Sequence, residues 1–329
     1  MLYTGNGTSQ SLTGVGFQPD LTWIKGRSVA EGQMLFDAVR GAGRRLMPHG
    51  NNAENYDAAI YLTAFNSDGF SVGGDEGVND DTETFVAWNW LAGNATLGTG
   101  DFTQGTSAST CSRNVDAGFS IVSYTGTGAN ATIGHGLSKA PEMIIVKKRN
   151  DTGDWMVQAN NDNTDYLRMN TTHASTDSDA AWNDTSPTAT LFSVGTDGAV
   201  NNNTQTFIAY CFHSVDGYSK FGGYEGNREV DGPFIYTGFR PAYVVTKVID
   251  DAHHWTIYNT DKATYNHDAT TAIYANENSA EGTGAVGTRR IDFLSNVFKL
   301  RHNSYDGNWD ISYIYFAFAE TPFKYSNAR

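Results

Sequence analysis

A seven-residue segment that occurs three times is the feature that most constrains this chain. It reads PDLTWIK from Pro19, PEMIIVK from Pro141 and PAYVVTK from Pro241. Each copy begins with proline, continues through apolar and β-branched residues, and ends with lysine. Because self-similarity at a regular spacing indicates duplicated structural units, the sequence predicts three diverged repeats of one fold.

Two further markers occur in the same order around this segment. An aromatic-x-Gly turn begins 16, 17 and 17 residues before the prolines, at Tyr3, Tyr124 and Tyr224. A strand rich in aromatic residues, with one alanine in it, follows each segment. The alanines lie 68, 68 and 76 residues after the prolines, at Ala87, Ala209 and Ala317. On this alignment the third repeat has about eight additional residues, which a loop accommodates at small cost.

The composition and the local pattern both favour β structure. The chain has 35 glycines and 13% aromatic residues, and short alternating runs are bounded by Gly, Asn, Asp and Ser. This pattern is typical of antiparallel β-sandwiches. Helical periodicity is nearly absent, and the best candidate allows at most a single turn near Leu35 to Arg40, because Gly41 and Gly43 interrupt it. The predicted class is all-β, with three tandem antiparallel sandwiches.

The repeats divide the chain into four segments. Repeat 1 covers residues 1–92, a Gly/Ser/Thr-rich linker covers 93–118, repeat 2 covers 119–217 and repeat 3 covers 218–329. The second junction is much shorter than the first. We therefore expect repeats 2 and 3 to pack together and repeat 1 to be more independent.

Strand geometry explains the repeated segment. Side chains alternate between the two faces of a strand, so Leu21 and Trp23 share one face and Ile24 lies on the other. Both faces are largely apolar or β-branched in all three copies, which predicts a central strand packed on both sides, or on one side with the other face under a loop. We expect the final lysine to cover apolar surface with its stem while its ammonium group reaches water. Trp155 and Trp255, each eight residues after its lysine, are expected in the core.

The alanine of each aromatic strand stands between large side chains. A small residue in that setting indicates a close approach of the facing sheet, where a larger side chain would overpack the core. We predict that Ala87, Ala209 and Ala317 are buried.

The charge and the apolar content exclude several partners. With 22 basic and 36 acidic side chains the net charge is −14, so most of the surface would repel a phosphate backbone. We predict no nucleic-acid partner. No apolar run approaches the roughly 20 residues of a membrane helix, and the N-terminal residues lack a signal-peptide pattern, so neither membrane insertion nor a secretory signal is expected. The two cysteines are predicted to be unpaired.

The usual catalytic motifs are missing. The chain contains no GxSxG, HExxH, P-loop, paired CxxC or dinucleotide fingerprint. We therefore predict a protein without enzymatic activity and without a cofactor. Carboxylates are abundant, so the pair used by a polysaccharide-degrading enzyme is an open alternative. Clusters of Asp, Asn and Gly, such as the one from Asn303, have two interpretations: tight turns, or oxygen ligands for calcium.

Aromatic residues in polar loops are the candidate binding residues. They are Trp182 in AAWNDTSP and Tyr305, Asp306 and Trp309 in NSYDGNWD. A flat ring beside Asn and Asp suits a sugar, because the ring stacks on the apolar face and the polar groups bind hydroxyls. The other interpretation is that each ring closes the end of its own sandwich.

The motifs in combination resemble a known family. YTGNG, GFQPDLTWIK, LFDAVRG, FNSDGFSVG and TFVAWNW, followed by GFRPAYVVTK, WTIYNTDK, FLSNVFKLR and YIYFAFAETPFK, are similar to an uncharacterised repeat domain of tail-associated proteins in tailed bacteriophages, especially marine phages and cyanophages. The resemblance covers nearly the whole chain apart from the linker. It implies a concanavalin-like or jelly-roll β-sandwich.

The same resemblance implies a function. It suggests a tail-fibre or tail-tip protein of the virion with a role in host attachment. Without a signal peptide, such a protein is expected to leave the cell by lysis. We further expect it to be an oligomer in the virion, to contact other virion proteins and to bind a host-surface polysaccharide. The resemblance assigns no catalytic or binding residue. The alternatives are a polysaccharide-degrading tail enzyme and a cellular carbohydrate-binding module.

Overall fold

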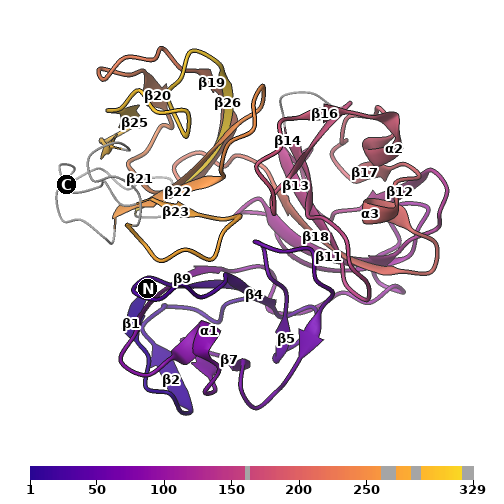
Figure 1. Cartoon of the computed structure of the whole chain (residues 1–329). Coiled ribbons are helices and arrows are strands. Elements are labelled where there is room, and N and C mark those ends of the chain that lie inside the picture. Colours follow the sequence, from indigo (N-terminus) through magenta and orange to yellow (C-terminus); the bar gives the residue numbers. More distant parts are fainter. Residues whose placement is uncertain (160–163, 261–271, 283–289, 321–329) are drawn as a thin grey trace.

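Three β-sandwiches surround a common centre in the computed structural model, which describes residues 1–159, 164–260, 272–282 and 290–320 (Figure 1). The described residues form antiparallel sheets with three one-turn helices, so the predicted all-β class is confirmed. We call the three sandwiches modules 1, 2 and 3. They cover residues 1–92, 93–217 and 218–320, shown in indigo to purple, magenta to red, and orange to yellow.

Module 1 consists of an inner sheet that faces the centre and an outer sheet. The inner sheet has the order β1(Leu2–Thr4)-β9(Thr84–Trp90)-β3(Leu21–Gly26)-β4(Met34–Asp37). The outer sheet has the order β2(Gln10–Thr13)-β8(Gly69–Val72)-β7(Leu62–Asn66). The short pair β5(Arg44–Arg45)-β6(Asn55–Tyr56) and the helix α1(Glu76–Asn79) complete it.

Module 2 repeats this plan with a wider inner sheet. Its order is β10(Ser109–Asn114)-β11(Phe119–Thr125)-β18(Thr206–Phe212)-β13(Met143–Lys148)-β14(Met156–Ala159)-β15(Asp165–Arg168)-β16(Thr176–Asp177). The outer sheet pairs β12(Ala131–Gly134) with β17(Leu191–Val194). The helices are α2(Asp179–Trp182) and α3(Gly198–Asn201).

Module 3 has the same two layers. The inner sheet has the order β19(Ser219–Glu225)-β26(Ser312–Ala319)-β21(Pro241–Val248)-β22(Thr256–Asn259)-β23(Ile273–Tyr274). The outer sheet has the order β20(Phe234–Tyr236)-β25(Val297–Leu300)-β24(Ile291–Phe293).

Part of the segment expected to be a linker belongs to module 2. Strand β10 lies within residues 93–118 and pairs along its whole length with β11. Gly105 forms a bridge with Ile133 at the free edge of β12, and the Phe102 side chain is buried in the module interior. The segment therefore adds to the inner sheet and also covers the edge of the outer one, although its composition is that of a linker.

The stretch near Leu35 to Arg40, where the sequence allows at most a single helical turn, contains no helix. Residues Met34–Asp37 form strand β4, which pairs with β3. Leu35 packs into the centre of the molecule, and Phe36 packs into the interior of module 1. Burial on both faces of a sheet overrides the weak helical propensity of this stretch.

The repeated segment is a central strand packed on both sides, as predicted. In β3, Leu21 and Trp23 point to the centre of the molecule, whereas Ile24 points into module 1. The corresponding strands β13 and β21 divide their side chains in the same way. Each copy therefore lies between two hydrophobic cores: one within its own module and one formed jointly by all three modules.

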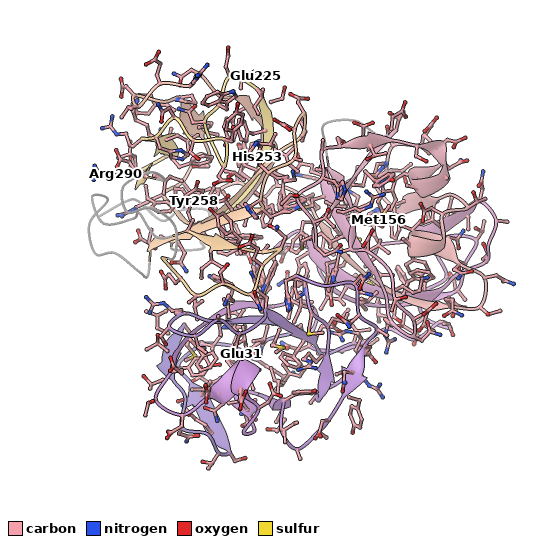
Figure 2. The ribbon with its side chains drawn as sticks, viewed as in Figure 1. Glu31, Met156, Glu225, His253, Tyr258 and Arg290 are labelled. Carbon is pink, nitrogen blue, oxygen red and sulfur yellow. The ribbon has the colours of Figure 1, made fainter. Side chains whose placement is uncertain are left out.

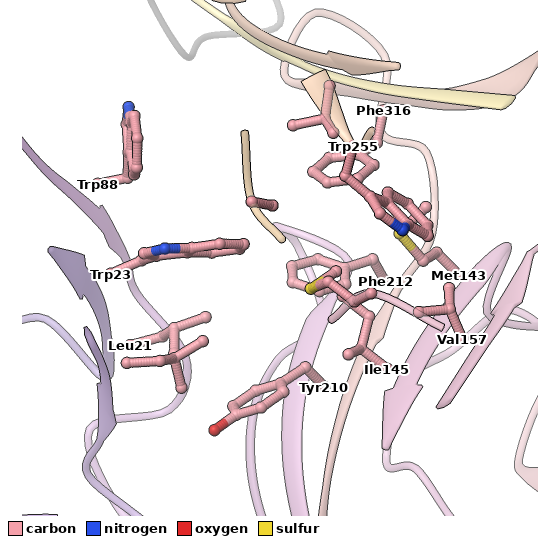
Figure 3. Close-up of a cluster of buried hydrophobic side chains, with 14 of the residues drawn as sticks. Leu21, Trp23, Trp88, Met143, Ile145, Val157, Tyr210, Phe212, Trp255 and Phe316 are labelled. Atoms are coloured by element: carbon pink, nitrogen blue, oxygen red, sulfur yellow. The ribbon is translucent and has the colours of Figure 1, made fainter. Parts of the chain in front are cut away.

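The common core, which we call the shared core, joins all three modules. Trp23 and Trp88, Met143 and Phe212, and Trp255 and Phe316 come from modules 1, 2 and 3 respectively and converge there (Figure 3). A cavity of about 20 Å³, lined by apolar and aromatic side chains of all three modules, remains at its centre. Trp155 and Trp255 are completely buried in this core, as predicted. The expectation that the first repeat is more independent is wrong, because its Trp90 ring contacts Phe318 of module 3 at 5.6 Å.

The lysine that ends each repeated segment is buried at an interface between modules. Lys25, Lys147 and Lys247 are all 0% exposed, so the expectation that the ammonium group reaches water is wrong. Each Nζ instead donates to a backbone carbonyl of another module: Lys25 to Asn278 at 3.3 Å, Lys147 to Asn51 at 3.5 Å and Lys247 to Thr172 at 3.2 Å. The three acceptors are equivalent positions of their modules.

Two further contacts repeat at the same interfaces. A side-chain N–H eight residues after each lysine donates to a carbonyl of the neighbouring module: Gln33 to Tyr274, Trp155 to Met47 at 3.0 Å and Trp255 to Arg168 at 2.9 Å. In the opposite direction, a backbone N–H of the neighbouring module donates to the carbonyl of the residue two places after each lysine. These bonds run from Glu281 to Arg27 at 2.8 Å, from Glu54 to Arg149 at 2.6 Å and from Ser175 to Ile249 at 2.8 Å. Module 1 therefore contacts module 3, module 3 contacts module 2 and module 2 contacts module 1. This is the closed head-to-tail ring of a cyclic trimer, formed within one chain.

The aromatic-x-Gly turns are held by a buried asparagine in each module. Asn79, Asn201 and Asn308 are 0% exposed, and their side-chain oxygens accept the backbone N–H of Asn6, Thr127 and Asn227. The hydroxyls of Tyr3, Tyr124 and Tyr224 donate to the carbonyl just before each asparagine, at 2.6 to 2.8 Å. These contacts account for the turn motif, since they place its glycine directly against the backbone that follows the asparagine.

This close approach predicts a large effect of adding one carbon atom. A Cβ on Gly226 would lie 1.8 Å from the carbonyl oxygen of Trp309. We expect Gly226→Ala to lower the free energy of unfolding by about 2 to 3 kcal/mol, because backbone must move to remove the overlap. The measurement is urea unfolding. Gly98→Ala is the control, since a Cβ there meets nothing within 4 Å. Equal midpoints for the two variants would contradict the expectation.

The predicted alanines are buried, but one of them is aligned two residues too far along the chain. Ala87, Ala209 and Ala317 are each 0% exposed, which confirms their burial. The register, however, pairs Lys25 with Val86, Lys147 with Ile208 and Lys247 with Ile314. The third module therefore carries Tyr315 at the alanine position. Gly222, which lies opposite this tyrosine on β19, provides the space for its ring.

Candidate binding surface on the third module

Trp182 is not on the surface. It ends the short helix α2, is 0% exposed and packs in the interior of module 2. Its polar sequence neighbours remain at the surface, while the indole fills the space between the two sheets. The hypothesis that this ring stacks on a sugar is therefore wrong, and the alternative, a ring that closes its own sandwich, describes it.

Tyr305 and Trp309 do come together, but not as open platforms. Their rings stack at 3.9 Å between centroids. The His253 ring covers the other face of Tyr305 at 4.5 Å, and the Arg228 guanidinium lies 3.7 Å from the Trp309 ring centre. We call these four residues the aromatic stack. A sugar needs a free ring face, and both central rings already have both faces covered.

The Tyr313 hydroxyl holds the backbone of the aromatic stack in place. The Trp309 backbone N–H donates to the Tyr313 hydroxyl, and this hydroxyl donates to the Tyr305 carbonyl, both at 2.8 Å. The stack joins three loops of module 3, and His253 lies on the side of the module that faces module 2 (Figure 2). Its geometry is that of a brace between loops, with ring edges but few ring faces exposed.

Asp306 is buried and cannot contact a surface ligand directly. It is 5% exposed, its carboxylate accepts from the Tyr274 hydroxyl at 3.1 Å, and its carbonyl accepts from the Thr246 hydroxyl at 3.1 Å. Its charge acts on Lys247. Burial lowers the pKa of Lys247 to about 7, against the opposing effect of Asp251 and Asp306. Asp306 therefore lies in the interior of module 3, close enough to the interface residue Lys247 to affect its pKa, and its assignment as a sugar contact is corrected.

The free aromatic faces of module 3 lie elsewhere, on strand β20. Phe234 is 62% exposed and Tyr236 is 65% exposed, whereas Ile235 between them points inward. We call Phe234 and Tyr236 the aromatic platform. These two residues are not among the candidates predicted from the sequence. The signal was present in GPFIYTG, where both outward positions of a short strand are aromatic.

The described ranges contain no group of three or more His, Cys, Asp or Glu side chains placed to hold a metal ion. Calcium binding through amide and carbonyl oxygens stays the untested alternative to tight turns for the Asp, Asn and Gly clusters. The two cysteines are unpaired, as expected, and both are buried. Within the described part of the chain, no helix has the length and apolar character needed to cross a membrane.

Comparisons with known proteins give a family but no relative of known activity. A search of curated proteins and a search of solved structures each returned no match. One family model matches residues 1–322, a range that includes all three modules. The chain belongs to the family described as Domain of unknown function (DUF7483).

Proposed function

We propose that this chain is a non-enzymatic protein of a tailed-bacteriophage virion and that it attaches the particle to the surface of its host. Its partners on this proposal are other virion proteins on one side and a host-surface polysaccharide on the other. The protein would leave the cell with the particle at lysis.

The observation that carries the proposal is the closed ring of three modules. The same lysine, N–H and backbone contacts recur at all three module interfaces. A ring of this kind presents three related surfaces around one axis, which suits attachment at a threefold or sixfold axis of an assembly. The resemblance of the repeated motifs to phage tail-associated proteins supports the same assignment.

Two further properties fit a structural component that works outside the cell. Three modules share one core, so no module can move without exposing apolar side chains of the others. The chain also carries a net charge of −14, which opposes non-specific association. A β-sandwich by itself implies no activity, and the proposal therefore depends on the ring.

The test uses particles of the virus whose genome encodes the chain. We expect antibodies against the recombinant protein to label purified particles, and we expect the recombinant protein to reduce adsorption of those particles to host cells in a concentration-dependent way. Particles that lack the chain would overturn the proposal. Shortening of host polysaccharide during incubation with the protein would replace it with the alternative of a degrading enzyme.

A further inference from the structure

The three outer sheets of the ring allow a direct comparison of equivalent surface positions. Leu12, Ile133 and Ile235 point inward and pair with Phe70, Phe192 and Phe298. The outward neighbours of these residues are Ser11 and Thr13 in module 1, Thr132 and Gly134 in module 2, and Phe234 and Tyr236 in module 3. Only module 3 has aromatic side chains at this position. The fold does not require aromatic residues there, and two exposed rings side by side on one strand point to a role in binding.

The platform is fixed in position before any ligand arrives. The carbonyl of Tyr236 accepts a hydrogen bond from the Tyr315 hydroxyl at 3.3 Å. Ile235 is buried in the interior of module 3 and anchors the middle of the strand. Lys299, the cross-strand neighbour of Phe234, places its ammonium group 3.7 Å from the Phe234 ring centre. A strand backbone that is already held in place loses little conformational entropy on binding.

Charged groups with balanced signs form a network that begins beside the Phe234 ring at Lys299. Lys299 contacts Asp231 at 3.0 Å, and Arg301 contacts Asp231 and Asp292, each at 2.7 Å. Two basic and two acidic side chains give this surface no net formal charge, although the chain as a whole carries −14. The carboxylates accept hydrogen bonds and the guanidinium donates them. Such a network matches a ligand that is uncharged and rich in hydroxyl groups.

We propose that the aromatic platform of module 3 is a carbohydrate-binding site for a neutral pyranose unit of a cell-surface polysaccharide. Phe234 and Tyr236 stack on the apolar face of the sugar ring, and Asp231, Asp292 and Arg301 bind its hydroxyl groups. This site deepens the proposed function and rests on it, since it names the ligand through which the virion protein would contact the host.

A protein partner fits this surface less well. The buried centre of a protein interface is depleted of charged residues, whereas here the Lys299 ammonium lies against the Phe234 ring and is joined through Asp231 to Arg301. A stable protein interface also needs roughly 800 Å² on each side, and two side chains contribute only a fraction of that area. A few sugar units match both the size and the mixed polarity of the platform.

The test replaces the platform with its counterpart from module 1. The variant Phe234→Ser with Tyr236→Thr carries the side chains of Ser11 and Thr13 on an unchanged fold. The full-length protein is first applied to an array of bacterial surface polysaccharides, and its affinity for a positive probe is then measured by titration calorimetry. We expect the double variant to lose roughly tenfold or more in affinity with no change in its thermal midpoint. Tyr56→Ser, at another exposed aromatic residue, is the matched control and should bind like the unmodified chain.

The outcomes separate this site from the function on which it rests. Unchanged polysaccharide binding by the double variant would overturn the platform while leaving host attachment in place. The platform would also be overturned as a carbohydrate site if the unmodified chain bound none of the polysaccharides and the double variant lost binding to a virion protein instead. Absence of the chain from purified particles would overturn the proposed function, and a platform that still bound polysaccharide would then belong to a protein outside the virion.

Discussion

The variant Trp155→Ala is expected to lower the free energy of unfolding by about 3 to 5 kcal/mol, the range found when a large buried aromatic side chain is truncated. The indole is 0% exposed in the shared core. Its Nε1 donates to the carbonyls of Met47 at 3.0 Å and Gly50 at 3.2 Å, both in module 1. The substitution therefore opens a cavity where the modules meet and also removes a bond between two of them.

Urea unfolding followed by circular dichroism measures this effect. We expect one cooperative transition for all residues, since a core shared by three modules unfolds as a unit. Trp155→Phe keeps most of the apolar volume but loses the Nε1 bond, and should cost about 1 to 2 kcal/mol. Tyr56→Ala, at a ring that is 58% exposed, is the control and should stay within about 0.5 kcal/mol of the unmodified chain. A separate transition for module 1 would contradict the shared core.

The second large effect is a rise in stability between pH 6.5 and pH 9. Burial, with the neighbouring Lys148 charge, lowers the pKa of Lys147 to about 8, and burial lowers the pKa of Lys247 to about 7. The ordinary value is 10.5. Within this window the unfolded chain binds more protons than the folded chain, so the free energy of unfolding increases with pH. The stabilisation is lost as the pH falls through 8 and then 7. We expect a gain of about 2 to 4 kcal/mol in total.

Other groups define the limits of this window. Burial raises the pKa of Cys111 from 9.0 to about 12, so the stabilisation linked to this thiol is lost as the pH rises above 9. On the acid side, burial lowers the pKa of His135 to about 4. Burial opposes ionisation of Glu54, but hydrogen bonds from Arg149 and the charge of Arg40 lower its pKa to about 2. The stabilisation from His135 and Glu54 is complete above about pH 6.5 and is lost only in more acidic solution.

Two lysine variants test the origin of the pH dependence. We expect Lys147→Met combined with Lys247→Met to be more stable than the unmodified chain at pH 6.5 and to have an unfolding midpoint in urea that is nearly constant up to pH 9. Lys139→Met, at an exposed position, should keep the full pH dependence. A rise of equal size in the double variant would show that the interface lysines do not cause it.

Much of the candidate surface could not be predicted from the sequence. Trp182 and Trp309 both stand in polar loops, yet the first is buried and the second is half-buried under Arg228. Asp306 looked like a turn residue at the surface and lies instead beside the interface around Lys247. Local composition describes the neighbours of a side chain along the chain, whereas burial depends on segments that are far away in sequence.

The sequence by itself determined the repeat and the two faces of each central strand. The period-two pattern of PDLTWIK and its two copies fixed which side chains share a face, because alternation is a property of an extended backbone. The pattern also located Trp155 and Trp255 in the core and predicted the burial of three alanines. The two-residue shift in alignment at Ala317 could not be predicted from this pattern, because Gly222, which leaves space for the Tyr315 ring, lies on another strand.

Only the tertiary structure decided what covers those faces. The apolar face that contains Trp23 could have packed within its own module, and the sequence held no sign that three such faces meet in one shared core. The same closure buries Lys25, Lys147 and Lys247, which an isolated module would leave in water. Periodicity predicts that a strand face is buried, but it does not predict which other surface packs against that face. That choice follows from the shape of three sandwiches closing on one another.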